Sequence, residues 1–299
     1  LLAVRDLGPR KVAIVGGNRI PFARSNGKYA DASNQDMLTA AIDGLASRYN
    51  LQGKRVGSVV AGAVLKHSRD FNLTRESVIG SVLDSASPAY DVQQACGTGL
   101  AAAIQVADAI ALGRIESGIA GGTDTTSDAP LSVNDDLRKT LIKVSSAKST
   151  VDRLKLLGEI RPQGLVPEQP QNAEPRTGLS MGEHAAITAR EMGVTRADQD
   201  ALAVASHHNL AASYDSGFQD DLVTPYLGVA RDDNMRPDSS EEKLGKLTPV
   251  FGKRDAEAHG TEATMTAGNS TPLTDGASTV LLASEELSLI HISEPTRPY

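Results

Sequence analysis

The chain has 299 residues, a net charge of −7 and 40% hydrophobic residues. These values are typical of a globular protein and argue against a nucleic-acid-binding surface over the whole molecule. No stretch approaches the roughly 18 apolar residues of a membrane span. The single cysteine excludes an internal disulfide and favours a reducing, cytoplasmic compartment.

Strand and helix patterns alternate along the first part of the chain. Short apolar runs predict strands at residues 11–15, 55–65, 89–95 and 117–124. The first of these is expected to end at Gly16 and Gly17. Apolar residues at helical spacing predict helices that begin near Ser33, Leu73 and Thr98. The alternation predicts an α/β fold with a parallel sheet and helices on both of its faces.

Residues 131–261 differ from this pattern. They are richer in proline, charge and turn signals, and they show no regular alternation of strands and helices. One helix is well marked, because Thr195 and Asp198 form a capping box and Gly217 can end it. We interpret the segment as an inserted domain.

The chain returns to strand character near its end. The run at 276–284 predicts a strand, so residues 262–286 are expected to complete the α/β unit formed by residues 1–130. Residues 287–299 continue none of these patterns, and we expect them to be a foreign or artefactual tail.

Cys96 lies between a predicted strand and a predicted helix, in the stretch QQACGTGL. A thiolate at the first turn of a helix faces unpaired backbone N–H groups and the positive end of the helix dipole, which stabilise the anion. Gly97 and Gly99 allow a sharp turn there, and the N–H groups of Cys96 and Gly97 can donate to an oxyanion. The alternative is a small buried side chain, and local physics leaves both interpretations open.

Two other kinds of site lack sequence support. No spacing of His, Cys and Asp is typical of a metal site. The turn VGGNRI does not have the glycine spacing of a dinucleotide-binding loop.

Five segments resemble the thiolase family, in its acetyl-CoA acyltransferase branch. They occur in the order of the family, between about Lys11 and Glu286, and they resemble most the thiolases of β-oxidation complexes. The segments are QQACGTGLAAAIQVADAIALG, GGTDTTSDAP, GLSMGEHAA, VTRADQDALAVASHHNLAASYDSGF and TMTAGNSTPLTDGASTVLLASEE.

The resemblance implies an acyltransferase of fatty acid β-oxidation in which Cys96 carries the acyl group. Such an enzyme cleaves 3-ketoacyl-CoA with coenzyme A to acetyl-CoA and a shortened acyl-CoA, or runs the reverse Claisen condensation. Coenzyme A is then a substrate, and no separate cofactor is implied. The family forms homodimers or tetramers, in some cases with a β-oxidation partner subunit. The alternatives are a decarboxylating condensing enzyme of the same superfamily and a non-catalytic module for CoA binding or dimerisation.

The resemblance also assigns a CoA site. The inserted segment corresponds to the loop domain that covers CoA, and Met181 falls where the family places a methionine against the pantetheine arm. His184 lies near the same path, and a binding or structural role is expected for it. Ala267 and Thr271 correspond to residues that line the tunnel, where Thr271 replaces the more usual serine. Ordinary core packing is the alternative for Met181.

Basic residues are concentrated in one stretch of this acidic protein. The stretch contains only one acidic residue, Asp152. Its six basic residues are Arg138, Lys139, Lys143, Lys148, Arg153 and Lys155. The stretch is expected to attract the phosphates of CoA, a membrane surface or a partner subunit, and a solvated face is the alternative.

Three further groups of the family's active site have no counterpart in this sequence. There is no Gly-His-Pro motif, no second cysteine and no Asn-Glu-Ala-Phe-like run. We therefore expect the chain to represent the N-terminal portion of a thiolase and to be nearly inactive alone. The helix that begins at Thr98 is so poor in charge that we expect it to be covered on nearly all sides. In the family it lies against the missing half, so without that half we expect an exposed apolar patch that is prone to aggregation.

Overall fold

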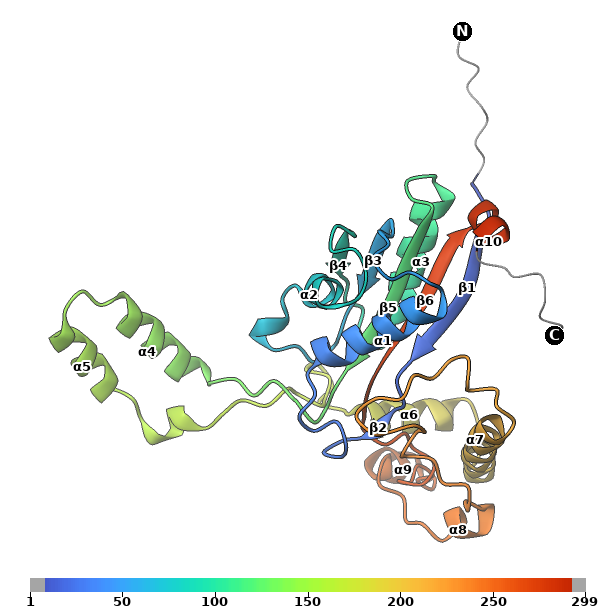
Figure 1. Ribbon diagram of the computed structural model, residues 1–299. Coiled ribbons are helices and arrows are strands. Elements are labelled where there is room, and N and C mark those ends of the chain that lie inside the picture. Colours follow the sequence, from blue (N-terminus) through green and yellow to red (C-terminus); the bar gives the residue numbers. More distant parts are fainter. Residues whose placement is uncertain (1–8, 292–299) are drawn as a thin grey trace. The chain divides into compact units, whose positions relative to one another are not determined.

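The computed structural model describes residues 9–291, and the chain divides into two compact units. The larger unit comprises Leu1–Asp128 and Met181–Tyr299 and contains the sheet, and the smaller comprises Ala129–Ser180 (Figure 1). Residues 181–261 therefore group with the sheet. The smaller unit, Ala129–Ser180, therefore has other boundaries than the predicted insertion, 131–261.

One sheet organises the larger unit. The strands follow the order β1–β6–β5–β3–β4, and β2 pairs with β6. Their bounds are β1 Val12–Arg19, β2 Ala23–Arg24, β3 Ser58–Ala61, β4 Ala89–Asp91, β5 Ser117–Asp124 and β6 Thr274–Ser284. The five predicted strands are all present.

The prediction of a parallel sheet is correct for only three strands. β3 pairs in parallel with β4 and β5, whereas β6 pairs antiparallel with both β1 and β5. The helical crossovers after β3 and β4 return the chain to the same end of the sheet and give parallel pairs. β6 enters after the long segment 125–273 instead, so no crossover helix fixes its direction.

The first strand is longer than predicted. It does not end at Gly16 and Gly17 but continues to Arg19, with a shift of register between Ile14 and Gly16. A Cβ atom on Gly16 would lie 1.6 Å from the Tyr49 hydroxyl oxygen. Glycine at this position therefore allows the Tyr49 side chain to approach the strand closely, and it does not mark a turn.

Helices cover both faces of the sheet, as predicted. On one face α1 (Asn34–Arg48) and α2 (Leu73–Gly80) pack on a core that includes Val59, Ile119 and Leu281. On the other face, α3 (Thr98–Ala111) packs on Val60, Ala120 and Leu282 (Figure 1). Each of these three residues directly follows one of the first three in the sequence. Adjacent residues of one strand point to opposite faces, so each such pair serves both cores.

The segment after the smaller unit is helical. Its helices are α6 Met181–Glu191, α7 Arg196–Asp215, α8 Glu241–Gly245 and α9 Lys253–His259. The predicted capping box of Thr195 and Asp198 is confirmed at the start of α7, and Gly217, with φ of 77°, follows its end. After β6, α10 (Glu285–His291) includes the first residues of the predicted tail, and the rest of that tail lies outside the described residues.

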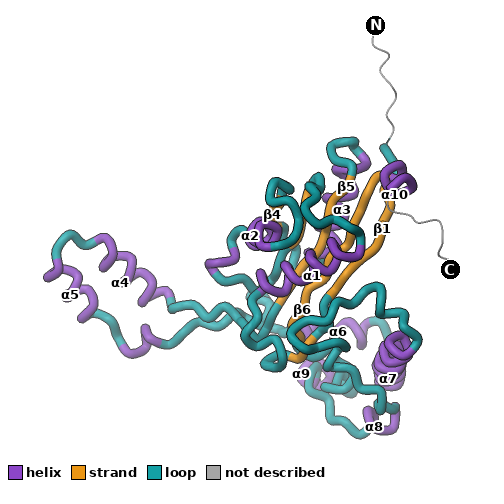
Figure 2. The backbone as a smooth tube through the Cα atoms, viewed as in Figure 1, coloured by secondary structure: helices purple, strands orange, loops and turns teal. Residues whose placement is uncertain are grey.

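The smaller unit is built around two helices. α4 (Asp135–Ser146) and α5 (Thr150–Gly158) are joined by a short turn, and a 3₁₀ helix, η2 (Pro162–Leu165), follows them (Figure 2). The Asn134 side chain caps α4 and the Ser149 side chain caps α5. Neither helix was predicted. Within residues 9–291, no helix combines the length and the apolar character that crossing a bilayer requires.

Candidate functional site

Cys96 lies in the turn between β4 and α3, as predicted, and its side chain is exposed. The alternative of a small buried side chain is therefore wrong. Gly97 is the N-cap residue of α3, so Cys96 lies two residues before Thr98, the first residue of the helix. The residue before it, Ala95, has φ of 45°, in the left-handed region that non-glycine residues seldom adopt.

A threonine fixes this turn. The Thr98 hydroxyl donates to the Ala95 carbonyl oxygen at 2.7 Å and accepts from the Gln94 N–H at 2.9 Å. The Gly97 N–H also donates to the Gln94 carbonyl oxygen, at 2.9 Å. Thr98 is buried, so these bonds hold the unusual conformation of Ala95 from the inside.

This hydrogen bond bears on the predicted oxyanion site. Because the Gly97 N–H already has an acceptor in Gln94, it can serve an oxyanion only by sharing or breaking that bond. The roles of the Cys96 and Gly97 N–H groups thus stay predictions. The signal that sequence reasoning missed is Thr98, two residues after the cysteine.

The surroundings of the thiol are open. A Cβ atom on Gly99 would have no neighbour within 4 Å, and the side chains of Leu100 and Ile104 are 69% and 51% exposed. Only one face of α3 is buried, through residues such as Val106 and Ile110. The expectation that this helix is covered on nearly all sides is wrong for this chain. The expected apolar patch is present, because Leu100 and Ile104 are exposed on α3.

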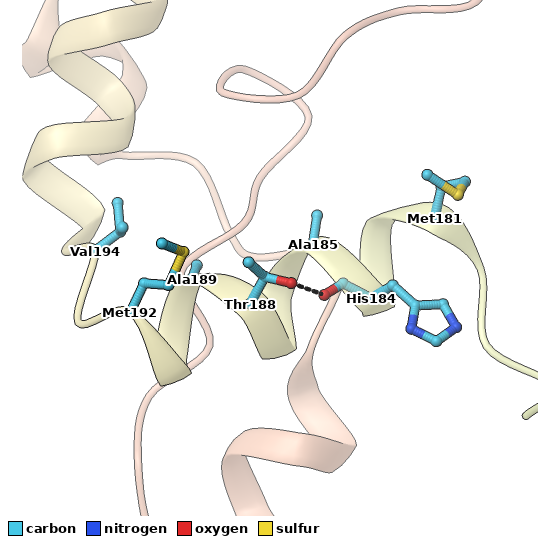
Figure 3. Close-up of a pocket in the computed structure, with 7 residues that line it drawn as sticks. All are labelled: Met181, His184, Ala185, Thr188, Ala189, Met192 and Val194. Carbon is cyan, nitrogen blue, oxygen red and sulfur yellow. Dashed lines mark hydrogen bonds between the residues drawn. The ribbon is translucent and has the colours of Figure 1, made fainter. Parts of the chain in front are cut away.

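Two of the predicted CoA-binding residues lie in one hollow. Met181 and His184 line a space of about 460 Å³ along α6, with Ala185, Thr188, Ala189, Met192 and Val194 (Figure 3). The Thr188 hydroxyl donates to the His184 carbonyl oxygen at 3.1 Å within the helix. The Met181 side chain is 73% exposed, so core packing does not explain it. The lining is almost wholly apolar, as a site for a hydrocarbon chain requires.

Ala267 and Thr271 are exposed and belong to a loop that is fixed on α7. The Asn269 amide group donates to Asp200 at 2.9 Å, and its oxygen accepts from the Thr266 N–H at 2.7 Å. Asp200 is itself buried and paired with Arg196 on α7 at 2.8 Å. The helix with the capping box therefore holds the loop in place.

The hollow on α6 does not bring Cys96 together with the predicted CoA-binding residues. The hollow on α6 is lined by neither Cys96 nor Ala267 nor Thr271. Within residues 9–291, no group of three or more His, Cys, Asp or Glu side chains is arranged to hold a metal ion.

A buried aspartate joins the start of β6 to the turn after β5. Asp275 has no exposed surface and accepts hydrogen bonds from the Thr125 hydroxyl at 3.0 Å, the Thr126 N–H at 2.8 Å and the Ser127 N–H at 3.1 Å. The Ser127 hydroxyl donates to it as well. This contact explains why two polar segments, GGTDTTSDAP and STPLTDGAS, occur together in one fold.

The end of β5 carries a second carboxylate, which is half-buried. Asp124 accepts from the N–H groups of Val64 and Leu65 at 2.7 and 2.9 Å, and burial raises its pKa although these bonds oppose the shift. Nearby in the chain, Asp128 binds the side chains of His67 and Arg69. These residues order the loop after β3, and the sequence alone did not point to them.

Comparison with known proteins places this geometry in one family. The model of the thiolase N-terminal domain matches residues 12–286. The 3-ketoacyl-CoA thiolase of Pectobacterium carotovorum subsp. carotovorum is 37% identical over 281 residues, which are 92% of this chain and 63% of that protein. That of Shewanella loihica is 38% identical over 291 residues, or 95% of this chain and 65% of that protein.

Solved structures agree with this assignment. Human mitochondrial 3-ketoacyl-CoA thiolase superposes with a TM-score of 0.76 at 25% identity, over 94% of this chain and 68% of that one. Bacillus anthracis acetyl-CoA acetyltransferase has the same fold, with a TM-score of 0.78 at 22% identity, over 97% and 69% of the two chains. The chain spans less than two thirds of the length of the curated relatives described here. With an exposed cysteine at the strand–helix turn and a family match over residues 12–286, the chain belongs to the thiolase family.

Proposed function

We propose that this chain supplies the acyl-accepting cysteine of a 3-ketoacyl-CoA thiolase, an enzyme of fatty acid β-oxidation. The observation that carries the proposal is the exposed Cys96 at the N-terminal end of α3, in a chain with the thiolase N-terminal domain. The thiolate is the nucleophilic form of cysteine, and the exposed position of Cys96 leaves its sulfur open to a substrate.

The proposed reaction has two steps. The Cys96 thiolate attacks the 3-keto carbon, the bond between carbons 2 and 3 breaks, and the acetyl-CoA enolate leaves and takes up the proton that the thiol lost. The thiol of free CoA then gives up its proton and attacks the thioester on Cys96. The proton that the CoA thiol gave up passes to the Cys96 sulfur as that sulfur leaves, so acyl-CoA is released and the Cys96 thiol is restored.

The hollow on α6 supports a place for the pantetheine arm. Its apolar lining, with Met181 at one end and Met192 at the other, suits a flexible chain of few charges (Figure 3). A human mitochondrial 3-ketoacyl-CoA thiolase has been solved in complex with CoA, and it has the same fold as this chain. In this proposal, Met181 and His184 contact the arm, and Ala267 and Thr271 line the path to Cys96.

Full turnover is proposed to need more residues than these 299. The chain has one cysteine and no Gly-His-Pro motif, so it offers neither a second thiol nor the histidine base of that motif. Loss of a positioned general base alone lowers rates by about 10²–10⁴-fold. A homodimer or tetramer in the cytoplasm, with or without a β-oxidation partner subunit, is part of the same proposal.

Acyl transfer to Cys96 tests the proposal directly. The chain is incubated with acetyl-CoA, and intact-mass and peptide mass spectrometry locate any acetyl group. We expect one acetyl group on Cys96 and none in the Cys96→Ala variant. An unmodified Cys96 in a protein that circular dichroism shows to be folded would favour a non-catalytic module.

A second measurement separates the thiolase from a decarboxylating condensing enzyme. Acetyl-CoA and an acetylated acyl carrier protein are compared as donors at equal concentration. Faster labelling of Cys96 by acetyl-CoA supports the thiolase, and faster labelling by the carrier protein supports the rival enzyme.

A further inference from the structure

Two of the five methionines of this chain are strongly exposed. All five lie in the described part of the chain, and the side chains of Met181 and Met192 are 73% and 75% exposed. Met37 is wholly buried, and Met235 and Met265 are half-buried. Methionine is an apolar residue that is usually buried. Packing in a core therefore does not explain the positions of Met181 and Met192.

Both exposed thioethers belong to the hollow on α6. Met181 is the first residue of that helix, and Met192 directly follows its last residue. Between them, Ala185, Thr188 and Ala189 continue the same side of the helix at spacings of three and four residues. All five residues line the hollow (Figure 3). The side chains between the two methionines are short, so they do not cover either thioether.

The hollow offers few partners to an added polar group. Thr188 and His184 carry the polar side chains of its lining, and the remaining lining side chains are apolar. The Thr188 hydroxyl already donates to the His184 carbonyl oxygen at 3.1 Å within the helix. An oxygen atom bonded to either methionine sulfur would therefore stand in an apolar space, and it would be hydrogen-bonded chiefly by water.

We propose that hydrogen peroxide oxidises Met181 and Met192, and that the resulting sulfoxides exclude the pantetheine arm of CoA from the hollow. The sulfur lone pair attacks one peroxide oxygen and the O–O bond breaks. The departing oxygen takes up the proton of the transferred oxygen and leaves as water. The sulfur is oxidised by two electrons, and the peroxide is reduced. This regulation rests on the proposed function, because the hollow is the place proposed there for the arm.

Oxidation changes the two side chains from apolar to polar. The sulfoxide oxygen is a strong acceptor that binds water, and the methylene and methyl groups of the arm can displace that water only by leaving the oxygen unpaired. Cys96 is exposed to peroxide as well. Its sulfenic acid is returned to the thiol by a thiol reductant, whereas methionine sulfoxide requires methionine sulfoxide reductases. The two kinds of oxidation can therefore be separated chemically.

Peptide mass spectrometry tests the oxidation site in the whole chain. The protein is exposed to dilute hydrogen peroxide, catalase stops the reaction at several times, and circular dichroism confirms that the oxidised protein is folded. We expect Met181 and Met192 to gain one oxygen atom each before the other three methionines react, because oxidation follows exposure. Oxidation of all five methionines at one rate, or earlier oxidation of Met37, Met235 or Met265, would overturn the proposal.

Calorimetric titration with CoA tests the consequence for binding. The titrations use the Cys96→Ala protein, in which neither acyl transfer nor thiol oxidation occurs, and catalase removes peroxide before CoA is added. Oxidation is expected to weaken CoA binding about tenfold, because an unpaired polar group then lies in the apolar hollow. Treatment of the oxidised protein with methionine sulfoxide reductases should restore the affinity.

Leucine variants show which methionines are responsible. Met181→Leu with Met192→Leu removes both thioethers of the hollow, so the affinity of this variant for CoA should be the same before and after peroxide. The matched control is Met235→Leu with Met265→Leu, which should still lose affinity on oxidation. Equal losses in the two double variants, or CoA binding that survives oxidation unchanged, would overturn the regulation alone. Absence of CoA binding before oxidation would also overturn the place proposed for the arm, and acetylation of Cys96 reports separately on acyl transfer.

Discussion

The turn before Cys96 stores backbone strain that a single substitution can release. Ala95, with φ of 45°, is in the left-handed region, which costs an L-residue roughly 1–2 kcal/mol. Ala95→Gly removes this cost because glycine has no Cβ atom. Glycine also loses about 0.5–1 kcal/mol more backbone entropy on folding. The middle values of the two ranges together predict a gain of about 0.75 kcal/mol in the free energy of unfolding.

Urea unfolding followed by circular dichroism measures this gain. The midpoint should rise and the slope should stay constant, because the substitution changes stability and not the surface exposed on unfolding. Asn50→Gly is the matched control. Asn50 has φ of 53°, but asparagine tolerates this conformation better than alanine does, so little or no gain is expected.

Two outcomes would refute this reasoning. One is an Ala95→Gly midpoint at or below that of the unmodified chain. The other is an equal gain for Asn50→Gly, which would show that the effect does not come from the Cβ atom of alanine. A confirmed gain would show that the protein keeps a less stable residue beside Cys96, as is common at functional sites.

Three further predictions concern carboxylates. Asp275→Ala leaves several buried donors without an acceptor and should lower the free energy of unfolding by about 3 kcal/mol or more in urea unfolding, while Asp275→Asn should cost less. Asp232→Ala leaves Arg19, whose guanidinium it binds at 2.7 and 2.8 Å, without its partner and should cost about 3–5 kcal/mol; an equal loss in the double variant with Arg19→Met would contradict this. The Thr195 side chain lowers the pKa of Asp198 in the folded protein. The stability that this hydrogen bond contributes is therefore present at pH values above the unfolded pKa near 3.9, and it is lost as the pH falls through the folded pKa. Thermal unfolding of Asp198→Asn should therefore depend less steeply on acid pH, and an unchanged acid limb would refute the assignment.

Local signals explain what could be predicted from the sequence. The apolar runs of β1 and β5 and the Thr195–Asp198 capping box act over a few residues, so one sequence suffices to find them. The direction of β6 was not predictable in this way, because it depends on pairing between residues far apart in the chain. The helices α4 and α5 were missed although Asn134 and Ser149 carry capping signals, because neither helix buries an apolar face.

The same distinction between local and long-range signals applies to the candidate site. A lone cysteine between a strand pattern and a helix pattern predicted the position of Cys96, which depends only on its neighbours. The conformation of Ala95 and the bond that occupies the Gly97 N–H depend on the buried Thr98 hydroxyl. Such hydrogen bonds are set by burial in three dimensions, and no periodicity in the sequence reports them.

The position of β6 has a consequence for synthesis of the chain. Thr274–Ser284 leaves the ribosome after the other strands described within residues 9–291, yet it lies between β1 and β5 in the sheet (Figure 1). Until it emerges, the facing edges of β1 and β5 lack their partner, and pairing over so long a separation slows folding. The nascent polypeptide therefore passes through a stage with two open edges, at which chaperones would be most needed.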